Sequence, residues 1–351
     1  MFDASPTPDT LTLSSSPTTA ASMRSKSVSP TTREVRLRRL QERARALAAE
    51  SRSQPTRRAY ETAWRQFGSF CAELGELSLP ASPETVALYI TERSATVSQS
   101  TISKDLAAIA ANHLDSGLPS PTNDDLVRRI RRGVRRSKGT APDRQVKPIL
   151  RDDMRKLVDA IDDGSPRGTR DKAVLLLAWS SAARRSELAA FTLGDLEFVP
   201  EGIRLRFRAG KTDQEGKGVY LGVPLAPDAR YCPVGAIRDW IAVLPGGDEM
   251  DDRMPLFREI RGRKVYPTAM SGRAVARAIK RACSRAGLSE DAYAGHSTRA
   301  GFATEAAKAG IALEALARHC RHRSLETTRR YVRPVNVFHG NAAAQVLSGA
   351  E

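Results

Sequence analysis

The first third of the chain places its apolar residues at the spacing of amphipathic helices. In residues 55–74 the apolar positions fall on one helical stripe, which consists of Tyr60, Ala63, Trp64, Phe67, Phe70, Cys71 and Leu74. Further helices are expected over residues 33–50, over 82–93, where Ser82 and a proline open the first turn, and over 100–116. This part of the chain, up to residue 137, is therefore predicted to be an all-helical domain.

The last helix of this domain is rich in arginine. Asn123 is a candidate cap for it, and Val127, Ile130 and Val134 share its apolar face. Its remaining positions hold six arginines: Arg128, Arg129, Arg131, Arg132, Arg135 and Arg136. Six like charges repel one another unless an anion covers them, so contact with a phosphate backbone is favoured over a merely solvated face. Such contacts position a protein on DNA without reading its bases.

Residues 138–149 are predicted to be a linker, because they contain glycine and prolines and have no hydrophobic periodicity. A second domain, residues 150–334, is expected to be mixed, with short strands at 203–208 and 219–223 around a hairpin turn. Helices are predicted at 151–162, 169–181, 233–244, 271–286, 297–309, 312–319 and 324–332. The fold class is therefore mainly α with a small antiparallel sheet (α+β).

The two ends of the chain differ from these domains. Residues 1–32 are rich in serine, threonine and proline and lack the apolar stretch of a signal peptide, so they are expected to form a disordered tail. Residues 335–351 include an apolar segment, 342–347, which is predicted to form a short helix that cannot fold alone.

The charge of the chain favours a polyanionic partner. The formal net charge is +16 and the pI is about 10.2, and neutralising phosphates releases counterions that supply binding free energy. Membrane-surface and ribosomal proteins are the alternatives that charge alone leaves open. The longest apolar run, residues 173–179, is too short to span a membrane. The four scattered cysteines indicate a reduced, cytoplasmic protein.

Six side chains suited to phosphodiester chemistry follow one another along the second domain: Arg184, Lys211, His296, Arg299, His322 and Tyr331. The arginines can hold phosphate oxygens, the lysine or a histidine can protonate a leaving oxygen, and the tyrosine oxygen can attack phosphorus without a metal. Glu187, three positions after Arg184, can orient its guanidinium. His296 and Arg299 fall on one face of a helix start, where both can reach one phosphate oxygen.

Tyr331 is the candidate nucleophile. A free tyrosine has a pKa near 10, so ionising it at pH 7 costs about 4 kcal/mol. The adjacent Arg329, Arg330 and Arg333 are expected to lower this cost, and a nearby base can accept the proton. His319 is the alternative to His322. His319, Cys320 and His322 lie too close together, without a fourth ligand, to indicate a metal site.

The order of these motifs resembles that of the tyrosine recombinases, the phage integrase family, over residues 33–345. The R-x-x-E-L box of the family matches Arg184 and Glu187, its hairpin lysine matches Lys211, and its H-x-x-R and H-x8-Y boxes match the pairs His296/Arg299 and His322/Tyr331. The greatest likeness is to Cre-type integrases, whose first domain carries a stretch similar to residues 113–121 before an arginine-rich helix. Two positions depart from the family pattern: Ala182 replaces a frequent glycine, and Cys320-Arg321-His322 replaces Leu-Gly-His.

The resemblance implies a site-specific recombinase. It implies a core-binding domain (33–137) and a catalytic domain (150–334) that form a C-shaped clamp on double-stranded DNA. Tyr331 would form a 3′-phosphotyrosyl link, with Lys211 as acid, and no metal, ATP or other cofactor would be needed. Four protomers would assemble on an inverted-repeat site and exchange strands through a Holliday junction, with residues 335–351 contacting a neighbour. The protein would be bacterial and cytoplasmic, on the nucleoid when bound to DNA.

Three other functions remain as alternatives. A type IB topoisomerase uses similar residues to relax DNA as a monomer. A metal-dependent nuclease or transposase is suggested by three acidic pairs, at residues 152–153, 162–163 and 251–252. A basic helical DNA-binding regulator would bind DNA without cleaving it, and it would leave the ordered motifs unexplained.

Overall fold

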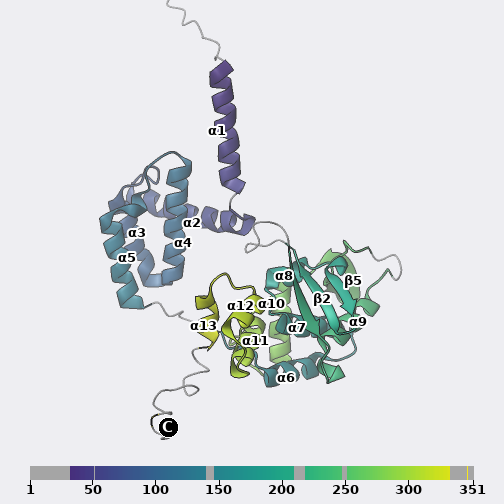
Figure 1. Cartoon of the computed structure of the whole chain (residues 1–351). Coiled ribbons are helices and arrows are strands. Elements are labelled where there is room, and N and C mark those ends of the chain that lie inside the picture. Colours follow the sequence, from purple (N-terminus) through teal and green to yellow (C-terminus); the bar gives the residue numbers. More distant parts are fainter. Residues whose placement is uncertain are drawn as a thin grey trace, which may run out of the picture. The chain divides into compact units, whose positions relative to one another are not determined.

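The computed structural model describes residues 32–50, 52–139, 146–208, 218–246 and 251–332, together with Val346. The chain divides into two units, residues 1–140 and 141–351 (Figure 1). The predicted fold class is confirmed: the described part of the first unit is helical, and the second unit adds small antiparallel sheets to its helices. No helix among the described residues is long and apolar enough to span a bilayer.

The described part of the first unit contains the helices α1 (Thr32–Glu50), α2 (Gln54–Leu74), α3 (Pro83–Thr96), α4 (Gln99–Asp115) and α5 (Asp125–Lys138). Helix α2 packs mainly on α4, and α3 packs mainly on α5. The predicted apolar stripe of α2 enters the core, where Phe67 and Phe70 are buried and contact the ring of Tyr89. Val127 of α5 is fully buried in the same core.

The helix starts partly differ from those predicted. Ser82 caps α3 as expected, with its hydroxyl accepting a hydrogen bond from the Thr85 N–H. Ser98 caps α4, two residues earlier than the predicted start. Asp124, and not Asn123, caps α5, because its carboxylate accepts from the backbone N–H two residues on while Asn123 ends a short 3₁₀ helix.

The second unit has the helices α6 (Arg151–Ile161), α7 (Pro166–Ser180), α8 (Arg185–Ala190), α9 (Pro233–Val243), α10 (Gly272–Arg285), α11 (Ser297–Lys308), α12 (Leu313–Cys320) and α13 (Leu325–Val332). Helix α7 is central, since it packs against α6, α9 and α11 and its residues 173–178 are all buried. The largest fully buried side chain among the described residues is Trp240 of α9, whose Nε1–H donates to the carbonyl of Leu256.

The strands form two antiparallel sheets. Strands β1 (Leu196–Val199), β2 (Gly202–Phe207) and β3 (Val219–Pro224) form one sheet in that order, and β4 (Arg258–Arg261) pairs with β5 (Lys264–Ala269). The two predicted strands are β2 and β3. Strands β1, β4 and β5 were not predicted, because their charged or irregular patterns do not alternate.

Helix α11 is placed by a close backbone contact at Gly301. A Cβ atom at this position would collide with the backbone carbonyl of Ile149, whose N–H also donates to the Ser297 carbonyl at 2.9 Å. The indole N–H of Trp179, which lies on helix α7, donates to the Ile149 carbonyl at 3.0 Å. The segment before α6 is therefore held between α7 and α11.

Gly301→Ala should destabilise the second unit by about 1–3 kcal/mol, because the obstacle is backbone and cannot rotate away. Thermal unfolding of the full chain measures this. Gly235→Ala on α9 is the matched control, since a Cβ there meets only ordinary contacts. Equal melting temperatures for the two variants would contradict the packing described for Gly301.

Candidate active site

The last helices of the second unit and the start of α8 bring together five of the predicted side chains. Helices α11, α12 and α13 pack around a small apolar cluster formed by Ala182, Ala303, Ala307, Leu316 and Cys320. Tyr331 lies on α13 against this cluster. His296 immediately precedes α11, Arg299 lies in its first turn, His322 follows α12, and Arg184 immediately precedes α8.

The hydroxyl of Tyr331 lies 2.8 Å from Nε2 of His296. On its other side, the ring of Tyr331 stacks on the ring of His322, with the centroids 5.9 Å apart and the planes within 8°. Nδ1 of His322 lies 2.8 Å from the hydroxyl of Thr328, which is fully buried on the helix of Tyr331. The tyrosine oxygen therefore contacts one imidazole and the tyrosine ring stacks on the other, and Thr328 is a positioning contact that sequence reasoning missed.

Burial decides the ionisation of Tyr331. It raises the pKa of the hydroxyl above its ordinary value, although the charge of Arg299 and, more weakly, that of Arg330 lower the pKa. The expected help from the adjacent arginines is therefore outweighed in the protein alone. Ionisation of this tyrosine requires a base that accepts its proton.

Both histidines are neutral at pH 7. Partial desolvation lowers the pKa of His296 below its ordinary value, and the charges of Arg299 and Arg184 lower it further. The same causes lower the pKa of His322 to about 4. A neutral imidazole has one nitrogen that accepts a hydrogen bond, so Nε2 of His296 can accept the proton of Tyr331.

Glu187 orients Arg184. Nη1 of Arg184 donates to one carboxylate oxygen of Glu187 at 2.5 Å, and the backbone N–H of Arg184 donates to the other at 2.7 Å. Nη2 of Arg184 donates to the backbone carbonyl of Arg321 at 3.2 Å. The Arg184 side chain keeps 37% of its exposure, so it can still contact an anion from solution.

Arg299 is almost completely buried, with 1% of its surface exposed. Its Nη1 donates to the carbonyl of Ala182 at 2.6 Å, and its Nη2 donates to the carbonyl of Cys320. Burial lowers its pKa to about 10, and the charge of Arg184 contributes, so the guanidinium stays protonated at pH 7. Each Nη carries a second hydrogen, so the group has donors left after it binds both carbonyls.

Arg321 belongs to the same cluster, although the sequence marked it only as a departure from the family pattern. Its side chain pairs with Glu187 at 3.2 Å and is 7% exposed. Its backbone has φ 54° and ψ 47°, a left-handed conformation that costs a residue with a side chain about 1–2 kcal/mol. The sequence signal for this conformation was the replacement of the family's glycine by Arg321 just before His322.

His319, the alternative to His322, is used elsewhere. Its Nε2 lies 2.9 Å from the carbonyl of Ser180, and its ring stacks on Phe302 with the centroids 4.3 Å apart. His322, by contrast, stacks on Tyr331. Within the described ranges, no group of three or more His, Cys, Asp or Glu side chains is arranged to hold a metal ion.

Residues 1–31 of the predicted tail and residues 140–145 of the predicted linker fall outside the described residues. Two predicted elements of the second unit also fall outside the described residues. Lys211 and the rest of the hairpin turn up to residue 217 are not among them, although β2 and β3 on either side are. Of the C-terminal tail from residue 335, only Val346 is described. The roles assigned to both elements stay predictions.

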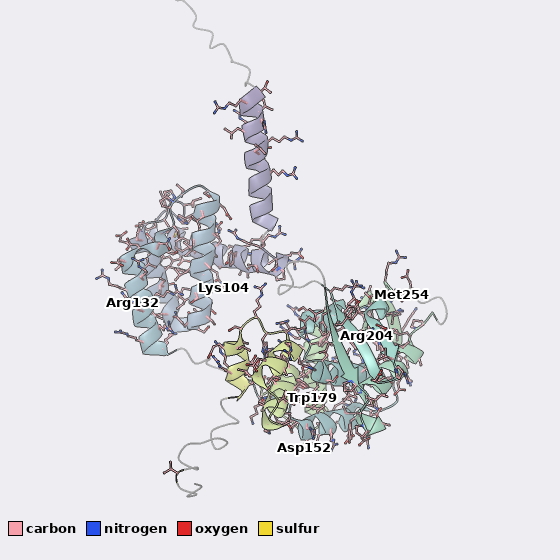
Figure 2. All side chains as sticks on the ribbon, viewed as in Figure 1. Lys104, Arg132, Asp152, Trp179, Arg204 and Met254 are labelled. Atoms are coloured by element: carbon pink, nitrogen blue, oxygen red, sulfur yellow. The ribbon has the colours of Figure 1, made fainter. Side chains whose placement is uncertain are left out.

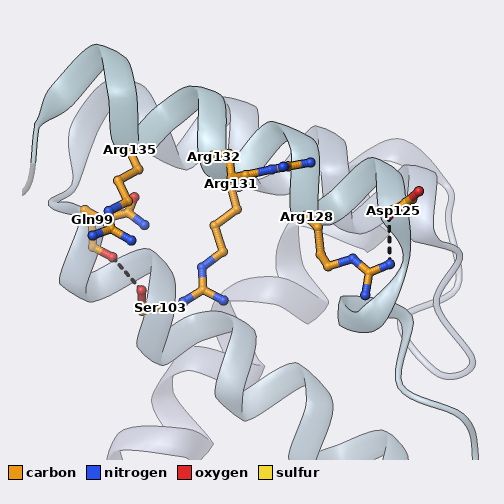
Figure 3. A pocket seen from close by; sticks show the side chains of 7 residues that line it. All are labelled: Gln99, Ser103, Asp125, Arg128, Arg131, Arg132 and Arg135. Carbon is orange, nitrogen blue, oxygen red and sulfur yellow. Dashed lines mark hydrogen bonds and ion pairs between the residues drawn. The ribbon is translucent and has the colours of Figure 1, made fainter.

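The six arginines of α5 are all exposed. Four of them line a hollow of about 690 Å³ together with Gln99, Ser103 and Asp125, namely Arg128, Arg131, Arg132 and Arg135. Figure 3 shows Arg131 and Arg135 reaching from α5 towards α4, while Arg128 donates to the Asp125 carboxylate at 2.7 Å. One carboxylate in the hollow leaves a large excess of positive charge, which suits a phosphate backbone.

Four of the six carboxylates in the acidic pairs that suggested a metal-dependent enzyme contact neighbouring side chains. Asp152 is exposed in the first turn of α6 (Figure 2). The four contacts are Asp153 with Tyr293, Asp162 with Lys172, Asp163 with Ser165 and Arg285, and Asp251 with Arg253. The backbone carbonyl of Asp252 accepts from the Gly194 N–H at 2.9 Å. These carboxylates therefore act as local structural partners.

Comparison with known proteins gives consistent matches. The model of the phage integrase family matches residues 147–336. An integrase/recombinase xerD homolog of Selenomonas ruminantium is 36% identical over 308 residues, which cover 87% of this chain and 89% of that protein. The recombinase cre of Escherichia phage P1 is 25% identical over 274 residues, 71% of this chain and 75% of that protein.

Solved structures share the fold. The Tn1549 transposon integrase in complex with transposon right end DNA superposes with a TM-score of 0.60 at 17% identity, covering 85% of this chain and 93% of that one. A lambda integrase dimer bound to a COC′ core site gives 0.55 at 14% identity, covering 84% and 93%. The family match spans more than half of the chain, and a relative is similar over nearly nine-tenths of both proteins. The chain therefore belongs to the phage integrase family and is a tyrosine site-specific recombinase.

Proposed function

We propose that Tyr331 is the nucleophile with which this recombinase cleaves and rejoins DNA. The observation that carries the proposal is the 2.8 Å contact between its hydroxyl and neutral His296, beside the guanidinium cluster. A bond forms between the tyrosine oxygen and phosphorus, the bond from phosphorus to the 5′ oxygen breaks, and a 3′-phosphotyrosyl link results. His296 accepts the tyrosine proton, and Lys211 donates a proton to the leaving 5′ oxygen.

Arg184, Arg299 and His322 hold the non-bridging phosphate oxygens, on which negative charge grows in the transition state. Removing one such donor should lower the cleavage rate about 10²–10³-fold. The phosphotyrosyl bond conserves the free energy of the original phosphodiester, so rejoining needs no ATP. The guanidinium groups supply the positive charge that metal ions supply in other phosphoryl-transfer enzymes.

The complete reaction adds DNA binding and assembly. Residues 33–137 form the core-binding domain and 150–334 the catalytic domain of a C-shaped clamp on double-stranded DNA, joined by the linker 138–149. Four protomers bind an inverted-repeat site, exchange strands through a Holliday junction and contact one another through residues 335–351. The DNA complexes of the solved relatives and the arginines of α5 support a DNA partner. The relatives from bacteria support the proposal that this protein acts on DNA of the bacterial nucleoid.

Tyr331→Phe should bind DNA normally but form no covalent adduct, because the ring keeps its contacts while the attacking oxygen is lost. The probe is a nicked duplex selected from a random pool by binding to the full chain, and adducts are scored on denaturing gels with EDTA present. Tyr266→Phe on β5 is the control and should form the adduct. An adduct that persists in Tyr331→Phe would place the nucleophile elsewhere. Loss of the wild-type adduct in EDTA would favour a metal-dependent enzyme.

The cleavage rate should not change with pH near pH 7, which lies above the ordinary pKa of histidine. The rate should fall once the pH is lowered below that pKa. The reason is that His296 must be neutral to accept a proton, and its pKa is lowered, so protonation begins only at more acidic pH. Single-turnover cleavage rates measure the effect over about pH 4.5–8, the range in which histidine titrates. His296→Ala should react about 10²-fold more slowly and lose this acid limb. An acid limb unchanged in His296→Ala would assign the base to another group.

Replacing Arg131 and Arg135 by alanine should weaken DNA binding equally for all sequences. The slope of log affinity against log salt should fall by about 1 for every arginine–phosphate pair that the substitutions remove. Arg204→Ala is the control, because Arg204 is an exposed arginine of β2 that pairs with Glu197. A salt dependence identical to that of the wild type would remove α5 from the DNA interface.

A further inference from the structure

Arg321 occupies a helix end that normally requires glycine. Helix α12 ends with the N–H of His322 donating to the Ala317 carbonyl at 3.0 Å and the N–H of Arg321 donating to the Arg318 carbonyl at 3.0 Å. This is the Schellman arrangement, in which the residue at the Arg321 position takes a left-handed conformation. A side chain is unfavourable there, so contacts made by that side chain must offset the backbone strain.

The guanidinium of Arg321 makes four hydrogen bonds. Nη1 donates to the carbonyls of Ser181 and His319 at 3.1 and 2.8 Å, and Nη2 donates to the Ala182 carbonyl and to Oε2 of Glu187, both at 3.2 Å. Ser181 and Ala182 lie in the connection between α7 and α8, which carries Arg184. One buried planar group therefore ties the end of α12 to this connection.

The same guanidinium contacts a third element. The Cζ atom of Arg321 lies 3.6 Å from the centroid of the Phe207 ring, within range of a cation–π interaction. Phe207 is the last residue of β2, the strand that leads into the hairpin turn of Lys211. Arg321 therefore also fixes the base of the hairpin strand against α12.

These contacts control two of the phosphate-holding residues. Glu187 divides its oxygens, so that Oε1 accepts from Arg184 and Oε2 accepts from Arg321 as well as from the Arg184 backbone N–H. Arg299 and Arg321 share the Ala182 carbonyl as acceptor. Displacing Arg321 would remove one of the donors to a carboxylate oxygen and one of the donors to a carbonyl. The carboxylate oxygen still accepts from the Arg184 N–H, and the carbonyl still accepts from Arg299, so both acceptors could then move with their remaining partner.

The charge state of Glu187 agrees with this geometry. Burial is the strongest single influence and would raise the pKa of the carboxyl, yet the pKa lies below its ordinary value. The hydrogen bond from the Arg184 N–H and the charge of Arg321 are the largest opposing contributions. Glu187 is therefore kept ionised as an acceptor for Arg184.

We propose that Arg321 is a positioning residue for strand cleavage, which aligns Arg184 through Glu187 and Arg299 through the Ala182 carbonyl without touching the phosphate. This inference rests on the proposed cleavage reaction. It also gives a reason for the arginine at a position where the family pattern has glycine.

The test compares Arg321→Gly, Arg321→Lys and the wild type, all as full chains. Glycine suits the left-handed backbone, so Arg321→Gly removes the guanidinium while relieving the strain at the helix end. Single-turnover adduct formation on the selected nicked duplex should fall about 10²-fold, as expected for a misaligned phosphate donor. DNA affinity should stay within about threefold, because phosphate contacts elsewhere are unchanged. Arg321→Lys keeps the charge and should recover part of the rate.

A double-mutant cycle with Glu187→Gln tests the route of the effect. Once Glu187 can no longer hold Arg184, Arg321→Gly should lower the rate by much less than it does in the wild type. Arg258→Lys is the control for losing a buried arginine, since Arg258 is buried in the same unit and donates to the carbonyls of Pro255 and Pro245. Its cleavage rate should match that of the wild type.

Two results would overturn the inference. The first is an Arg321→Gly variant that cleaves as fast as the wild type, whether or not its melting temperature and DNA affinity fall. The second is an effect on the rate that is undiminished beside Glu187→Gln. A wild-type protein that forms no adduct, while Tyr331→Phe binds DNA equally well, would instead refute the proposed cleavage reaction. The wild-type lane therefore separates the two failures.

Discussion

Three guanidinium groups crowd one site, and this concentration of positive charge is the constraint on which the rest of the structure depends. Arg184 and Arg321 both pair with Glu187, while Arg299 donates to backbone carbonyls. The carbonyls that accept from these groups lie at the ends of α7 and α12, where helix dipoles place partial negative charge. The Glu187 carboxylate and the C-terminal ends of α7 and α12 offset part of the repulsion among the three guanidinium groups. They leave an excess that a phosphodiester, and still more its transition state, can neutralise.

The same field explains why a base accompanies the tyrosine. Arg299 lowers the pKa of Tyr331 and of both histidines, but burial raises the tyrosine pKa by more. The nucleophile therefore stays protonated, while His296 stays unprotonated and able to accept. These two opposite pKa shifts favour transfer of the tyrosine proton to His296 during the attack, and not a tyrosinate that is already ionised before it. A standing tyrosinate would also bind tightly to the arginines and compete with the phosphate for them.

The sequence was informative where chemistry depends on residue type and failed where it depends on backbone conformation. The stripe of α2, the helix of Val127 and the strands flanking the hairpin were predicted, because burial imposes a period on the pattern. Strands β1, β4 and β5 were missed, because pairing with a partner strand, and not their own pattern, stabilises them. Asp124 replaced Asn123 as a cap because a 3₁₀ turn intervened. Arg321 looked like a simple departure, since its contacts with Ser181 and Phe207 span more than a hundred residues.

The conformation of Arg321 also separates His322 from His319, the alternative that the sequence left open. His319 lies within the last turn of α12, and its ring faces Ser180 and Phe302. The left-handed residue then turns the chain out of the helix, so His322 stacks on Tyr331 instead. Three positions along a continuing helix would have put both imidazoles on nearly the same face. The helix end therefore gives one histidine a structural contact and the other a place beside the nucleophile. It does so through a backbone conformation that the Arg321 side chain offsets with its own hydrogen bonds.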